Sequence, residues 1–246
     1  MPTLLLNGIV TSCTDYRDND RILTLFTFER GRIDAKARNC RKPTAPLVAC
    51  AQPFAFAEYE LFYNRGRYTV NQYELKESFF ALREDVERFS LASVATRLCQ
   101  EAVQQEQPNE ELFSLLYHTL SFLTYGDCAP SDILLCFLLR FLDIIGYCPT
   151  ITRCAGCGRD LRQEARIYFS AARGGAVCPG CCQHDRQISK TALEAMRRIL
   201  LKKDPELAEV RMKDELNREI GTALVRYLEH IFGADNRATV FLRQKY

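Results

Sequence analysis

Two pairs of closely spaced cysteines constrain this sequence more than any other feature. Cys154 and Cys157 form one Cys-x2-Cys pair, and Cys178 and Cys181 form a second pair after twenty intervening residues. Two such turns supply four thiolates to one tetrahedral ion, which is the arrangement of a structural zinc site. Four protein ligands leave no open coordination position. We therefore predict a Zn2+ ion that holds the fold and takes no part in chemistry.

The ligand set has alternatives. Cys182 follows the second pair directly and competes for the fourth position, with His184 two residues further on. We favour Cys181 because it keeps the two-residue spacing. A redox pair or two disulfides are the other interpretations, and a cytoplasmic chain disfavours them. The first twenty residues lack the basic start and long apolar run of a signal peptide, so the cytoplasm is the expected compartment. The other seven cysteines are scattered, and we expect them to be small core residues: Cys13, Cys40, Cys50, Cys99, Cys128, Cys136 and Cys148.

Residues 1–75 have the pattern of a small β-barrel. They contain about five strand-like stretches with no helical pattern between them. Two connections are tight turns, at residues 29–32 and 64–67, and each includes a glycine that can adopt the positive φ of a hairpin loop. A run of strands without intervening helices favours a closed or half-closed barrel over a doubly wound sheet.

The period of the apolar residues becomes helical after residue 77. Ser78 is the expected N-cap of a first helix, which ends before Pro108. Further helices are expected over 111–126, 130–147, 188–203 and 214–233. The predicted fold class is α+β, with a barrel domain at 1–77, a helical domain at 78–147 and 188–246, and a zinc-finger insertion at 148–187.

Cationic side chains gather in one stretch of the barrel sequence. Fifteen residues, 29–43, include two acids and six cations: Arg30, Arg32, Lys36, Arg38, Arg41 and Lys42. On a strand, Arg32, Lys36 and Arg38 share one face because side chains alternate. Such a row attracts a phosphate backbone, although cations on a sheet edge also prevent unwanted pairing. Residues 78–146, by contrast, carry a net charge of −6, which suggests separate units with different surfaces.

Aromatic residues accompany these cations. They are stacking candidates for unpaired bases, or else simply core residues: Tyr16, Phe26, Phe28, Tyr59, Tyr63 and Tyr68. Several enzyme signatures are missing from the sequence. It has no Gly-Lys dipeptide and hence no P-loop for nucleotides, and it lacks HExxH, GxSxG and the His-x-Glu of zinc deaminases. We therefore expect a binding protein and not an enzyme, with no nucleotide ligand. No stretch is long and apolar enough to suggest a membrane span.

Several motifs together resemble a known family. The segment LNGIVTSCTDYRDNDRILTLFTFERGRIDAKARNCRKP is similar to the start of bacterial RecO, the recombination-mediator family of DNA repair proteins. The CAGCG and CPGC pairs resemble the zinc element of many members, and FFALREDVERFSLASVATRL and LLRFLDIIGYCP resemble the helical core. The likeness extends over nearly the whole chain and depends on the order of the motifs.

The resemblance implies a fold and an activity. The fold is an N-terminal OB barrel, a helical domain and an inserted zinc finger. The activity is binding of single- and double-stranded DNA and annealing of complementary strands without nucleotide hydrolysis. With RecR, such proteins help RecA replace single-strand binding protein (SSB). The implied phosphate contacts are Arg32, Lys36, Arg38, Arg41 and Lys42, and the implied location is the bacterial nucleoid. Asn39 and Cys40 depart from the small residues usual at their positions in the family.

The sequence is also compatible with two other functions. One is a protein-interaction adaptor, in which the OB barrel grips peptides and the zinc knuckle braces them. The other is a zinc-dependent enzyme that acts on nucleic acid. A salt-dependent DNA-binding assay separates the adaptor from a DNA-binding protein. Loss of activity without loss of fold on mutation of Cys154 would indicate the enzyme.

Overall fold

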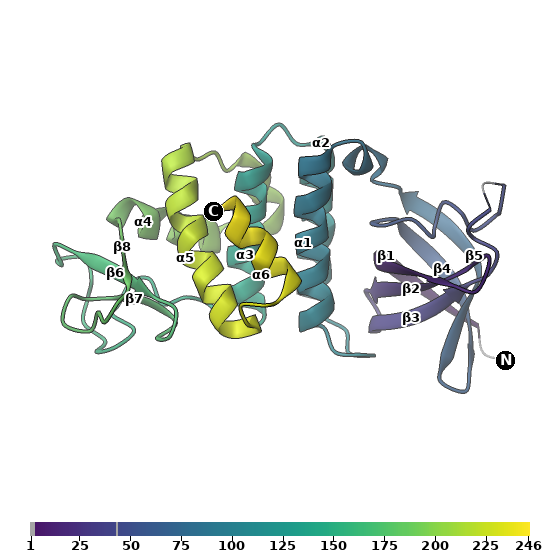
Figure 1. Cartoon of the computed structure of the whole chain (residues 1–246), viewed down its shortest axis with the longest axis horizontal. Coiled ribbons are helices and arrows are strands. Elements are labelled where there is room, and N and C mark those ends of the chain that lie inside the picture. Colours follow the sequence, from purple (N-terminus) through teal and green to yellow (C-terminus); the bar gives the residue numbers. More distant parts are fainter. Residues whose placement is uncertain (1–2, 43) are drawn as a thin grey trace. The chain divides into compact units, whose positions relative to one another are not determined.

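The computed structural model describes residues 3–42 and 44–246 (Figure 1). The chain folds into two compact units, Met1–Tyr125 and Gly126–Tyr246. The first unit contains five strands, a 3-10 turn and two helices. In chain order these are β1 (Thr3–Tyr16), β2 (Asp20–Thr27), β3 (Gly31–Ala37), β4 (Phe56–Asn64), β5 (Arg67–Glu77), η1 (Phe80–Arg83), α1 (Val86–Ala102) and α2 (Glu110–Tyr125).

The five strands close into a barrel with the order β1-β2-β3-β5-β4, which confirms the predicted OB fold. All strand pairs are antiparallel except β3 with β5, where Lys36 lies opposite Thr69. Alternation places one side of each strand in the barrel interior, as in β3, where Ile33, Ala35 and Ala37 are buried. Their burial leaves Arg32, Asp34 and Lys36 on the outer face, so Arg32 and Lys36 share one face as predicted, whereas Arg38 lies beyond the end of β3, in the turn that follows it.

Both predicted tight turns are present. Gly31 has φ +65° at the β2–β3 turn and Gly66 has φ +76° at the β4–β5 turn, so each uses the left-handed region that glycine adopts without cost. Arg65 also has a positive φ, of 49°, as a two-residue hairpin loop between Asn64 and Arg67 requires.

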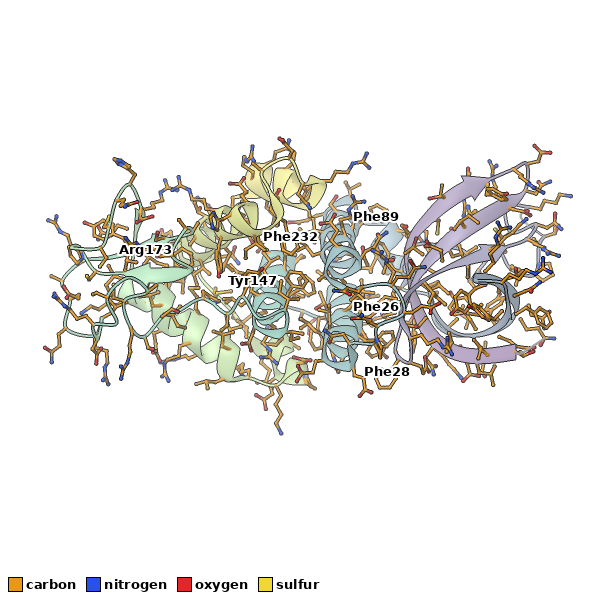
Figure 2. All side chains as sticks on the ribbon, turned by 90° about the horizontal axis from the view of Figure 1, so that it is seen from below. Phe26, Phe28, Phe89, Tyr147, Arg173 and Phe232 are labelled. Atoms are coloured by element: carbon orange, nitrogen blue, oxygen red, sulfur yellow. The ribbon has the colours of Figure 1, made fainter. Side chains whose placement is uncertain are left out.

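Helix α2 packs on one side of the barrel through aromatic rings. Phe113 makes edge-to-face contacts with Phe26 of β2 and with Phe28 just after it, at centroid distances of 5.4 and 5.6 Å (Figure 2 labels both Phe26 and Phe28). Tyr117 contacts Phe56 at 5.3 Å. This side of the barrel is therefore covered by the chain's own helices. The barrel surface available to a ligand lies elsewhere.

The start of the first helix differs from the prediction. Ser78 is not its N-cap. Its hydroxyl accepts the N–H of Phe80 at 3.3 Å and the Glu77 carboxylate accepts the N–H groups of Ser78 and Phe79, but the chain makes only the short turn η1 here. Helix α1 begins at Val86, where the side chain of Asp85 accepts the N–H of Arg88 at 3.0 Å.

The second unit is built around one largely buried helix. Its elements are α3 (Pro130–Ile144), β6 (Ile167–Ser170), β7 (Gly175–Val177), β8 (Arg186–Ile188), α4 (Lys190–Leu201), η2 (Asp204–Glu209), α5 (Asp214–Phe232) and α6 (Arg237–Lys245). Most of α3 is buried, and it packs against α4, α5 and η2. Its buried Asp132 accepts hydrogen bonds from the side chain of Asn217 at 2.6 Å and the N–H of Met212 at 3.1 Å. Strands β7, β6 and β8 form a separate small sheet.

Two further details correct the expectations. Helix α6 was not predicted, and Cys148 is exposed although it was expected in a core. Five of the other scattered cysteines are buried and Cys13 is half-buried, as small apolar residues would be. No helix in the described part of the chain combines the length and apolar character needed to cross a bilayer.

Candidate nucleic-acid interface and metal centre

The two cysteine pairs lie on two tight turns that the backbone holds side by side. Cys154 and Cys157 belong to the turn after α3, closed by the N–H of Gly158 donating to the carbonyl of Cys154 at 2.8 Å. Cys178 and Cys181 follow β7, where the N–H of Cys181 donates to the carbonyl of Cys178 at 3.0 Å. The turns are joined by the N–H of Ala155, which donates to the carbonyl of Ala176 at 2.8 Å.

This arrangement brings the four predicted ligands together. The Sγ atoms of Cys154, Cys157, Cys178 and Cys181 all lie within 4.8 Å of one another, and those of Cys157 and Cys178 are 3.8 Å apart. A tetrahedral zinc ion with Zn–S bonds of about 2.3 Å requires neighbouring sulfurs about 3.8 Å apart. The cluster is a site that can hold a metal ion, and its all-thiolate composition suits a soft one.

Cys182, the alternative fourth ligand, is not part of the cluster. Its Sγ lies 4.0 Å from the carbonyl of Asp185. Gly156 shows how closely the two turns approach, because a Cβ at this position would crowd the Sγ and Cβ of Cys181. Glycine in the first knuckle therefore makes room for the fourth sulfur.

The backbone also donates hydrogen bonds to one of these sulfurs. Burial opposes ionisation of Cys154. Hydrogen bonds from the backbone N–H groups of Cys178, Cys157 and Gly156 outweigh it and lower the pKa of the thiol to about 6. Such N–H donors around a sulfur are the outer shell that a metal thiolate uses.

The six cations predicted to contact DNA fall into three groups. Arg30 and Arg32 make hydrogen bonds to other elements of the first unit: Arg32 donates to the carbonyl of Gln100 in the last turn of α1 at 2.8 Å, and Arg30 donates to the hydroxyl of Tyr68 on β5 at 3.3 Å. Tyr68 in turn donates to Glu106 at 2.7 Å. The guanidinium groups of Arg30 and Arg32 are thus both engaged in hydrogen bonds within the first unit.

Lys36 and Arg41 form ion pairs at the opposite end of β3. Lys36 lies 2.8 Å from Asp20, and this ammonium group, helped by the N–H of Asn39, lowers the pKa of the Asp20 carboxyl. Arg41 lies 3.3 Å from Asp15 and donates to the carbonyl of Asp18 at 3.1 Å.

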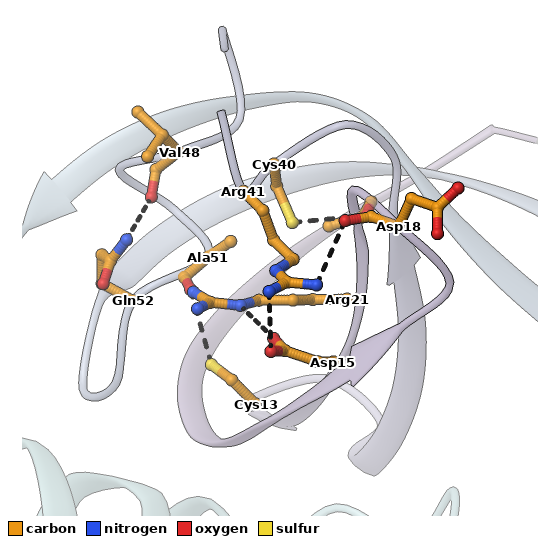
Figure 3. A network of polar contacts seen from close by, with 10 residues as sticks. Cys13, Asp15, Asp18, Arg21, Cys40, Arg41, Val48, Ala51 and Gln52 are labelled. Atoms are coloured by element: carbon orange, nitrogen blue, oxygen red, sulfur yellow. Dashed lines mark hydrogen bonds and ion pairs between the residues drawn. The ribbon is translucent and has the colours of Figure 1, made fainter. Parts of the chain in front are cut away.

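Figure 3 shows how Arg41 connects two loops. Asp15 lies between Arg41 and Arg21, whose Nε donates to it at 3.0 Å. The N–H of Arg41 also donates to the carbonyl of Asn19 at 3.2 Å. Loop 17–19, between β1 and β2, and loop 38–42, after β3, are therefore joined, and we call them the basic loops.

Arg38 and Lys42 form the third group. Both are exposed, and among residues 3–42 and 44–246 neither side chain has a hydrogen bond or an ion pair. Sequence reasoning missed three similar cations, namely Arg17 in the basic loops and Arg65 and Arg67 at the β4–β5 hairpin. All three are exposed. Their position in the loops β1–β2 and β4–β5 of an OB barrel was the signal that could have identified them, since these loops often contact ligands.

Comparison with known proteins gives one consistent result. The family model described as "Recombination protein O N terminal" matches residues 1–79, and "Recombination protein O C terminal" matches residues 83–237. A "DNA repair protein RecO" of Desulforamulus reducens is 30% identical, over 98% of this chain and 94% of its own length. One of Symbiobacterium thermophilum is 33% identical, over 91% and 90%, and one of Bacillus pumilus is 30% identical, over 96% and 92%.

Proposed function

Because the chain belongs to the RecO family of DNA repair proteins, we propose that it binds single- and double-stranded DNA and anneals complementary strands. Further, we propose that it acts with RecR to help RecA replace SSB on gapped DNA, at the bacterial nucleoid. Neither step requires nucleotide hydrolysis, and the sequence has no P-loop.

The observation that carries the DNA-binding part is the set of unpaired cations on the barrel. Arg38 and Lys42 in the basic loops and Arg65 and Arg67 at the hairpin face solvent without an acidic partner among the described residues. A charge without a partner keeps its full attraction for phosphate and releases counterions when a strand binds. Lys36 and Arg41 add charge to this surface, although each would have to share it with an acid.

The cysteine cluster supports a structural role for the metal. We infer that the ion is Zn2+, because four thiolates in a tetrahedral arrangement are typical of structural zinc and leave no position for water or substrate. The ion would tie together a module whose strands β6, β7 and β8 have only three or four residues each. A zinc enzyme would need an open ligand position, which this set does not provide.

A protein-interaction adaptor remains the alternative, and it makes a different prediction about salt. DNA binding through phosphate contacts weakens steeply as salt rises, with a slope of about −0.7 in log K against log salt per contact on a single strand. An adaptor on the same barrel would bind DNA weakly or not at all.

The DNA-binding test uses a double charge reversal, Arg38→Glu with Lys42→Glu. Loss of two contacts should lower the affinity for a fluorescent oligonucleotide and reduce the salt slope by about 1.4. Lys76→Glu is the control, because it reverses a charge on β5 that is already paired with Glu74 at 2.8 Å. An unchanged slope in the double variant would remove the basic loops from the DNA interface.

The annealing test measures duplex formation between complementary oligonucleotides coated with SSB, with and without RecR and without ATP. We expect duplex formation that is faster with the protein than with SSB alone and needs no ATP. If the protein binds each strand but never accelerates pairing, the proposed mediator activity is wrong and only DNA binding remains.

A further inference from the structure

The structure sorts the six aromatic residues that accompany the barrel cations. Phe26, Tyr59 and Tyr68 are buried, and the hydroxyl of Tyr59 donates to the carbonyl of Cys50 at 3.0 Å. Phe28 packs edge-on against α2, and Tyr63 packs against the ring of Tyr68 with centroids 4.9 Å apart. These five side chains pack within the first unit, although Phe28 is 39% exposed, about as much as the sixth, Tyr16.

Tyr16 differs from the other five because its ring lies among cations at the edge of the barrel. It is the last residue of β1, lies opposite Asp20 of β2, and remains 40% exposed. The Nζ atom of Lys36 is 5.0 Å from its ring centroid, and the Cζ atom of Arg17 is 5.3 Å from it. Both distances are those of cation–π contacts.

The surroundings of Tyr16 are held in place by the basic loops. Lys36 is fixed over the ring by its ion pair with Asp20, and the Asp20 carboxylate also accepts the N–H of Asn39 in the second loop. Arg17, the next residue in the chain, is exposed and has a positive φ of 55°. A planar ring and a planar guanidinium group are thus presented together, and both are surfaces on which a nucleobase can stack.

We propose that Tyr16, assisted by Arg17, stacks against one unpaired base and gives this barrel a preference for single-stranded DNA. This inference rests on the proposed DNA-binding function. The cations of the basic loops attract phosphates of any strand, whether paired or not, because they contact the backbone. An exposed aromatic ring adds affinity only for a strand with unpaired bases, because bases within a duplex already stack on one another. Phosphate contacts would therefore supply attraction, and Tyr16 would supply the discrimination.

The experiment compares two 15-nucleotide ligands, oligo-dT and an abasic strand of the same length and charge. The variants are Tyr16→Leu, which removes the ring, and Tyr16→Phe, which keeps it. Phe80→Leu is the matched control: Phe80 is 57% exposed and has the guanidinium of Arg83 at 5.1 Å from its ring, but it lies on η1 outside the basic loops.

We expect the wild type, Tyr16→Phe and Phe80→Leu to bind oligo-dT about tenfold more tightly than the abasic strand, the effect of one stacked base. In Tyr16→Leu this ratio should fall towards one while affinity for the abasic strand stays unchanged. Equal weakening for both ligands would mean that the ring acts only by positioning Lys36 and Arg17, which overturns the proposal. An unchanged ratio in Tyr16→Leu overturns it as well.

A fluorescent variant provides a second readout. The chain contains no tryptophan, so Tyr16→Trp introduces a single reporter at the proposed stacking site. Oligo-dT should quench this tryptophan and the abasic strand should not, whereas equal quenching by both contradicts base stacking. If the wild type binds neither ligand in a salt-dependent way, the proposed DNA-binding function itself fails. That result is distinct from binding without discrimination.

Discussion

Substitution of Gly31 by alanine should destabilise the first unit far more than the same change at Gly66. Both glycines are in hairpin turns of the barrel and have similar dihedral angles, φ +65° and φ +76°. At Gly66 a Cβ would meet nothing within 4 Å, whereas at Gly31 it would overlap the carbonyl group of Gln107. The two positions therefore differ in crowding and not in backbone strain.

The expected magnitude follows from the contacts around Gly31. A left-handed alanine costs about 1 kcal/mol at either position. At Gly31 the segment of Gln107 must also move, which threatens the hydrogen bond from the N–H of Glu106 to the carbonyl of Arg32 at 3.1 Å and the one from Tyr68 to Glu106 at 2.7 Å. With about 1 kcal/mol for each bond, Gly31→Ala should lower the free energy of unfolding by about 3 kcal/mol, and Gly66→Ala by about 1 kcal/mol.

The measurement is urea unfolding followed by tyrosine fluorescence, since the chain has eleven tyrosines and no tryptophan. Hydrogen exchange of β2 and β3 amides would assign the loss to the barrel, because the chain has two units that need not unfold together. Equal destabilisation by the two substitutions would refute the packing of the turn on residues 104–107.

Three further predictions concern the second unit. Cys154→Ala should abolish binding of one zinc ion per chain, and Cys182→Ala should retain it, as measured by metal analysis of the purified protein. Cys154→Ala should also raise hydrogen exchange across residues 150–188 while the barrel amides stay protected. Gly156→Ala should weaken zinc affinity in a chelator competition, because its Cβ crowds the fourth sulfur; an unchanged affinity would show that the knuckles adjust freely. Asp132→Ala should lower the free energy of unfolding in urea by about 2 to 3 kcal/mol, because it leaves the buried side-chain amide of Asn217 without its acceptor. An unchanged free energy would show that water replaces the carboxylate.

Much of the local structure could be predicted because its causes lie within a few residues. The alternation in β3 places Ile33 and Ala35 inside and Lys36 outside whatever the strand pairs with. The turn glycines and the Cys-x2-Cys spacing are local in the same sense. Grouping of Cys181 with Cys154, and not of Cys182, follows from that spacing, because only one of two adjacent side chains can point to the ion.

The start of the first helix could not be predicted from such local signals. Ser78 has the composition of an N-cap, and its hydroxyl accepts the N–H of Phe80 at 3.3 Å, but Phe79 is buried and has a positive φ of 46°, so only the turn η1 forms and the helix begins after Asp85. Burial of Phe79, whose ring lies against Tyr117 of α2, is a tertiary effect. The same is true of Cys148, whose apolar neighbours in sequence did not cover it.

By itself, the sequence determined the strands, the turns, the metal knuckles and the presence of a cationic stretch, since these depend on residues close together in the chain. Only the tertiary structure decided which cations stay available. Arg32 donates a hydrogen bond to a carbonyl 68 residues away, and Lys36 forms an ion pair with a carboxylate on the neighbouring strand. Arg38 and Lys42 face solvent. The physical reason is that a cation interacts with the acceptors and carboxylates that lie within a few ångströms of it in space. Folding brings those partners together from distant parts of the chain.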